Sequence, residues 1–192
     1  YGDPSGPLVL YFHGTPGSHL EVHAASEELP SSGIHIVAIN RPGIGYSTYQ
    51  QGRTILDWPT DVAEFLVATN QGDKPFGVIG FSGGTPYALA CAHVMPQRVS
   101  RVAIVSGHTS VGIPGVAPGK EDRFIELFLH RPRLAKKAVK ITRKRLRKKP
   151  DKIVARVTKR WDPSDQALIN RDPFLRGILE ASLKHSTLRG EQ

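Results

Sequence analysis

The chain has 192 residues, enough for one globular domain with an inserted lobe, and 39% of them are hydrophobic, so a sizeable core can form. Its single cysteine, Cys91, excludes an intramolecular disulfide framework and is expected in the core. No apolar run approaches the roughly 18 residues of a membrane span. Since no signal peptide is visible either, we expect a cytoplasmic protein.

The positive charge is concentrated in one part of the chain. The formal net charge is +9, and residues 120–160 contain 17 Lys and Arg against 4 Asp and Glu. The remaining residues carry more acids than bases. The basicity therefore belongs to one segment and does not characterise the whole fold.

Apolar runs and helical patterns alternate through the first half of the chain. Strands are expected at 7–12, 35–40, 76–81 and 101–106, with helices at 18–29, 57–70 and 84–95. This alternation predicts the α/β class with a mostly parallel sheet that helices cover on both faces. A linker rich in Gly and Pro follows at 107–119, and residues 121–187 are expected to be helical, with breaks at Pro132, Pro150, Pro163 and Pro173. We therefore divide the chain into an α/β core at 1–111 and an inserted helical cap at 112–192.

Ser82 stands between glycines, in the sequence Gly80-Phe81-Ser82-Gly83-Gly84. An expected strand precedes it and an expected helix follows it. Glycines permit a sharp turn between the two, and the turn would expose the serine at the carboxyl end of the strand. This context favours a nucleophile, although a Gly-rich turn without chemistry would have the same local pattern.

Two further turns follow the first two expected strands. The stretch His13-Gly14-Thr15-Pro16-Gly17 could supply a backbone donor for an oxyanion. The stretch "RPGIGYS" at 41–47 is expected to be a rigid turn that shapes the pocket wall.

Together these three stretches resemble the α/β-hydrolase superfamily, in the type with an HG-x-P loop, an RPG-x-G-x-S turn, a G-x-S-x-G elbow and a helical cap. The resemblance implies that Ser82 is the nucleophile and that the oxyanion donors are the N–H groups of Thr15 and Gly83, with Gly14 beside them. Epoxide hydrolases and haloalkane dehalogenases resemble this layout but have aspartate at the nucleophile position, so the serine argues against both.

The base and the acid that such a serine needs are not evident after Ser82. The superfamily order is serine, acid, histidine, and no acid lies between Ser82 and Lys120. His13 and His108 are candidates for the pocket, but neither follows an acid in this order. We expect that the chain is a fragment that lacks the acid and the histidine, and that it does not hydrolyse p-nitrophenyl acetate at an enzyme-like rate.

Residues 131–150 combine Lys and Arg with apolar residues at helical spacing and contain no aromatic residue. They could bind an anionic surface weakly, but without a stacking platform no specific nucleic acid is expected. The alternative is an ordinary cap helix with a solvated charged face.

The leading hypothesis is a serine hydrolase that cleaves an ester, amide or related acyl bond of a small-molecule substrate through an acyl-enzyme. No cofactor is implied, and the histidines lack the spacing of a metal site. The alternative is a non-catalytic protein of the same fold that binds a ligand or a partner.

Overall fold

The computed structural model describes residues 1–107, 126–127, 130–159 and 161–185. It contains a four-stranded parallel sheet with the strand order β2-β1-β3-β4. The strands are β1 (Leu8–Phe12), β2 (His35–Ile39), β3 (Phe76–Phe81) and β4 (Val99–Val105). The predicted α/β class and all four predicted strands are confirmed.

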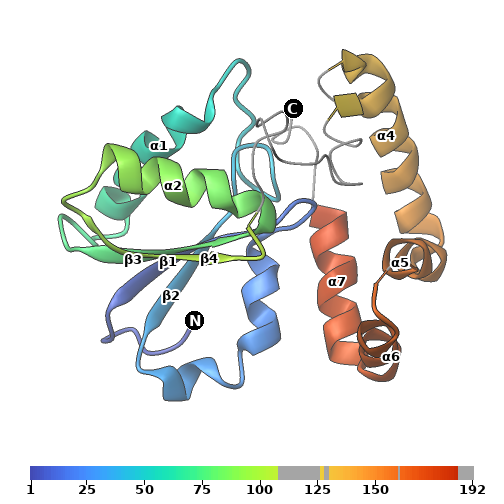
Figure 1. Cartoon of the computed structure of the whole chain (residues 1–192), viewed down its shortest axis with the longest axis horizontal. Helices are drawn as coiled ribbons and strands as arrows, with labels where there is room; N and C mark the ends of the chain where they lie inside the picture. The colour runs from blue at the N-terminus through green and yellow to red at the C-terminus, as the bar shows by residue number, and fades with distance from the viewer. Residues whose placement is uncertain (108–125, 128–129, 160, 186–192) are drawn as a thin grey trace, which may run out of the picture.

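Helical segments lie on both faces of the sheet (Figure 1). On one face lie α1 (Trp58–Ala68) and α2 (Thr85–Val94), close to their predicted positions. Side chains of α1 and α2 pack there on Leu10, Phe12 and Val78, and Cys91 is part of this core as expected. Because side chains alternate along a strand, Val9 and Tyr11 of β1 instead face the second cluster on the opposite side.

The opposite face differs from the prediction in its local structure. The helix expected at 18–29 is a short 3-10 helix, η1 (His19–Ala25), followed by a second, η2 (Leu29–Ser32). The Ser18 side chain caps η1 by accepting the N–H of Leu20. Pro30 has no N–H to donate to an upstream carbonyl, so it does not continue the helix as an α-helix.

Among the described residues from 130 onward there are four helices, and each begins at one of the four prolines expected to break the helical pattern. They are α4 (Pro132–Lys148), α5 (Pro150–Thr158), α6 (Pro163–Arg171) and α7 (Pro173–His185). Proline suits the first helical position because the N–H that it lacks would have no intrahelical partner there. Asp162 and Asp172 cap α6 and α7 by accepting backbone N–H groups.

Helix α7 joins these helices to the core. It contacts η1 on one side and α4 and α5 on the other. In Figure 1 it therefore lies between the sheet and the α4–α5 pair. No helix in the described part of the chain is long and apolar enough to cross a membrane.

Candidate active site

The turn at Ser82 connects β3 to α2 through the single 3-10 turn η4 (Ser82–Gly84). Ser82 is half-buried and has a φ of +46°, in the left-handed region that non-glycine residues rarely adopt. Such a conformation costs on the order of 1–3 kcal/mol and is typical of functional sites. The glycine at position 80 is needed for this turn, because a Cβ there would lie 2.9 Å from the Cβ of Ala88 in α2.

The loop after β1 lies directly against this turn. A Cβ added at Gly83 would be 2.8 Å from the Cβ of Thr15 and 3.2 Å from its backbone nitrogen. The structure thus brings together the two residues whose N–H groups were expected to hold the oxyanion. Only glycine at position 83 permits this close approach.

Arg41, the first residue after the Asn40 that ends the predicted second strand, is buried beneath both segments with an exposed fraction of 1%. Its Nη1 donates to the carbonyl oxygens of His13 (2.9 Å) and Gly83 (3.0 Å). Its Nη2 donates to the carbonyl oxygen of Gly14 (3.0 Å) and to Thr15 Oγ1 (2.9 Å). One guanidinium group therefore ties the loop after β1 to the turn that carries the serine.

These bonds determine where the amide of Thr15 points. In a trans peptide the C=O and the following N–H point in opposite directions. The Gly14 oxygen faces Arg41, so the N–H of Thr15 points away from Arg41, and it has no hydrogen-bond partner among the described residues. It is available to an incoming oxygen atom.

The N–H of Gly14, in contrast, is occupied. It donates to Glu21 Oε2 over 2.9 Å, and the same oxygen accepts the Tyr11 hydroxyl over 3.0 Å. Burial raises the pKa of the Glu21 carboxyl, while these two hydrogen bonds oppose the shift. The N–H of Gly14 is therefore not free for an oxyanion, and the hydrogen bonds of Gly14 to Glu21 and Arg41 instead hold the loop in place.

His13 was a candidate for the pocket, but the structure places its side chain in the interior, with an exposed fraction of 0%. Its Nδ1 lies 2.9 Å from the Gly14 oxygen, and its Nε2 accepts the N–H of Arg41 over 3.4 Å. Burial and the nearby Arg41 charge lower its pKa to about 3. Such a ring is a neutral structural element of the loop.

The Ser82 hydroxyl has no hydrogen-bond partner within the described ranges, so no base is paired with it there. His93 is exposed in the last turn of α2, and His185 ends α7 beside Gly45. His108, the other candidate, lies outside the described residues.

Sequence reasoning missed the roles of Arg41 and Glu21. Arg41 follows a buried strand directly, and a charged residue at that position could have indicated a site at the sheet edge. Glu21 has no comparable signal, because its role depends on a contact with a loop seven residues earlier.

Known structures share this architecture. A hydrolase from Pseudomonas aeruginosa PA01 superposes with a TM-score of 0.63 at 19% identity, over 99% of this chain and 64% of that one. A putative lipase from Acinetobacter baumannii AYE gives a TM-score of 0.62 at 18% identity, over 99% of this chain and 56% of that one. At these identities the likeness concerns the fold alone.

Sequence comparison agrees with the fold. Epoxide hydrolase B of Mycobacterium tuberculosis is 31% identical over 120 residues, and the match covers 59% of this chain but only 33% of that enzyme. The sequence model of the alpha/beta hydrolase fold matches residues 7–185. With the parallel sheet, the strained serine turn and this match over nearly the whole chain, the protein belongs to the α/β-hydrolase fold family.

Proposed function

We propose that the protein is a serine hydrolase that cleaves an ester, amide or related acyl bond through an acyl-enzyme at Ser82. The observation that carries the proposal is the meeting of the strained Ser82 turn with an unoccupied N–H at Thr15. A nucleophile and a backbone donor at one point are what acyl transfer requires.

The reaction follows from this arrangement. Ser82 Oγ attacks the carbonyl carbon of the substrate while a general base, not among the described residues, takes the hydroxyl proton. Negative charge develops on the carbonyl oxygen, where the N–H groups of Thr15 and Gly83 donate to it. The base returns the proton to the leaving alcohol or amine, and water then hydrolyses the acyl-enzyme in the same way.

Arg41 supports the oxyanion without touching it. Its bonds to carbonyl oxygens on one side of the loop keep the Thr15 amide directed to the other side. Its positive charge, buried close by, also favours a developing negative charge. Arg41 is thus a positioning residue.

The serine distinguishes this proposal from epoxide opening. The resemblance described above implies aspartate at the nucleophile position of epoxide hydrolases, whereas this chain has Ser82. We therefore assign acyl transfer, although a relative carries the name epoxide hydrolase. The helices within 112–192 would serve as the cap that selects a small-molecule substrate.

A fluorophosphonate probe tests the proposal on the protein expressed from its whole reading frame. We expect the wild type to be labelled and the Ser82→Ala variant to lose labelling and ester hydrolysis by at least about 10³-fold. Ser106 offers a matched control, because it also has a positive φ, of +49°, and follows the neighbouring strand β4. The Ser106→Ala variant should be labelled by the probe to the same extent as the wild type.

Two results would contradict the proposal. Labelling that persists in Ser82→Ala would assign the reactive serine elsewhere. A wild-type protein that is folded but inert to the probe and to p-nitrophenyl esters would favour the non-catalytic binding protein.

A further inference from the structure

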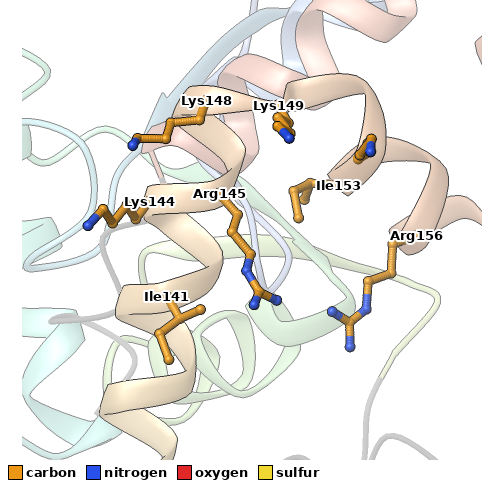
Figure 2. A pocket seen from close by; sticks show the side chains of 8 residues that line it. Ile141, Lys144, Arg145, Lys148, Lys149, Ile153 and Arg156 are labelled. Atoms are coloured by element: carbon orange, nitrogen blue, oxygen red, sulfur yellow. The ribbon is translucent and has the colours of Figure 1, made fainter.

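A hollow lies between α4 and α5, in the basic part of the chain. It has a volume of about 570 Å³, within the range of small-molecule sites. Its lining consists of Ile141, Lys144, Arg145, Lys148, Lys149, Lys152, Ile153 and Arg156. Figure 2 shows these side chains around the turn that joins the two helices.

The residues around the hollow are mostly cationic and include no acid, and their apolar stems together with the two isoleucines form most of its surface. Six of its eight side chains are Lys or Arg. Asp151, the acid of α5, is engaged elsewhere, since its Oδ1 accepts Arg176 of α7 over 2.6 Å. Within the described ranges none of the six cations has an ion-pair partner. The like charges therefore repel one another, and a bound anion would relieve that repulsion.

Two arginine and two isoleucine side chains share the space inside the hollow. The guanidinium groups of Arg145 and Arg156, one from each helix, extend into the same space in Figure 2, and Ile141 and Ile153 point toward it as well. Guanidinium groups suit phosphate oxygens, because their donors form a planar fork. The two isoleucines offer an apolar surface that a small inorganic ion would leave unused.

We propose that this hollow is a binding site for a phosphate-bearing amphiphile. The phosphate binds between Arg145 and Arg156, the surrounding lysines add long-range attraction, and a short apolar chain contacts Ile141 and Ile153. The ligand can be a free alkyl or acyl phosphate compound or the headgroup of a membrane lipid, since both present the same chemistry.

The site is separate from the serine. Helix α7 lies between the α4–α5 pair and the core in Figure 1. The proposal therefore does not depend on the proposed hydrolase activity, and Ser82→Ala should leave the binding unchanged.

Isothermal titration calorimetry with monohexyl phosphate and with inorganic phosphate tests the site. We expect monohexyl phosphate to bind more tightly than inorganic phosphate. Arg145→Gln combined with Arg156→Gln should weaken its binding by about tenfold or more, because charge-assisted hydrogen bonds are lost. In the Ile141→Ser variant, the affinity for monohexyl phosphate should fall close to the affinity for inorganic phosphate.

The matched control removes two charges from the same helix outside the hollow. Lys137 and Lys140 are exposed on α4 and do not line it. Lys137→Gln combined with Lys140→Gln should change binding less than about twofold at moderate salt, where surface charges are screened. Equal weakening by both double variants would overturn the proposal, because it would show only general attraction to a basic helix. Absence of monohexyl phosphate binding to the folded wild type would overturn it too.

Vesicles distinguish the two sources of ligand. Cosedimentation with phosphatidylcholine vesicles that contain phosphatidic acid, reversed by monohexyl phosphate, would identify a lipid headgroup. Binding of monohexyl phosphate without cosedimentation would identify a free ligand.

Discussion

At the scale of single residues, the site depends on which backbone groups are held and which are left free. Arg41 and Glu21 engage the two ends of the peptide between His13 and Gly14, since Arg41 donates to its oxygen and Glu21 accepts from its nitrogen. The next peptide is held only at its oxygen, so the N–H of Thr15 stays available. In the proposed reaction, the role of this loop depends on side chains that do not themselves react.

Replacing Arg41 should therefore impair catalysis more than substrate binding. Arg41→Met removes the four hydrogen bonds described above between Arg41 and the two segments, and it should destabilise the fold by ~3 kcal/mol. At temperatures where the variant is folded, we expect kcat for an ester to fall by about tenfold or more with little change in KM, because the oxyanion forms only in the transition state. Arg41→Lys should recover part of the stability but little of kcat. A variant whose kcat equals that of the wild type would show that Arg41 has a structural role only.

His13 should make stability depend on pH. Its pKa of about 3 in the folded protein lies below the ordinary 6.5, so in this window the unfolded chain binds a proton that the folded one excludes. The contribution of neutral His13 to the free energy of unfolding is complete above pH 6.5. It is lost as the pH falls, by up to about 1.4 kcal/mol per pH unit.

Urea unfolding at pH 7.5, 6.5 and 5.5 measures this dependence. His13→Asn keeps a donor for the Gly14 oxygen but does not titrate, so its unfolding free energy should decrease less with falling pH. His93→Asn, at an exposed histidine, should follow the wild type. Equal pH slopes for His13→Asn and the wild type would refute this assignment.

At the scale of elements, β4 is the least covered strand. It pairs with β3, and within the described ranges no strand lies on its outer edge. Val102, Ile104 and Val105 are 41%, 42% and 46% exposed, although parallel strands are normally buried on both faces. An apolar edge of this kind is a template for pairing with another chain.

We expect the 192-residue chain to self-associate through β4. Val102→Lys should shift sedimentation velocity profiles toward the monomer, because a charged edge opposes pairing. Val67→Lys adds the same charge at a 67% exposed position on α1 and should leave the sedimentation profiles unchanged. A wild type that remains monomeric at every concentration would rule out this association.

At the scale of the whole molecule, the site combines segments that are distant in the sequence. The loop after β1, Arg41 after β2 and the Ser82 turn after β3 meet because parallel strands place their carboxyl ends on one edge of the sheet. The α4–α5 hollow belongs to another part of the molecule and has a different electrostatic character. A single chain thus carries two candidate sites that can be tested separately.

The sequence by itself determined the strands, the breaks between the later helices and the turn at Ser82. These depend on local signals, namely apolar runs, prolines that interrupt a helical pattern and glycines around one serine, which act over a few residues. They also suffice for the resemblance to the α/β-hydrolase family, which the family match over residues 7–185 confirms.

Only the tertiary structure decided the rest. The burial of His13, the bonds of Arg41 and the occupation of the Gly14 amide by Glu21 arise from contacts between segments that local patterns do not encode. The basic run at 131–150 likewise predicted a charged helix face, and only the turn at Pro150, which brings α5 beside α4, makes it one wall of a hollow. Local propensity specifies the elements, whereas the directions of hydrogen bonds and the shape of a cavity depend on how those elements pack.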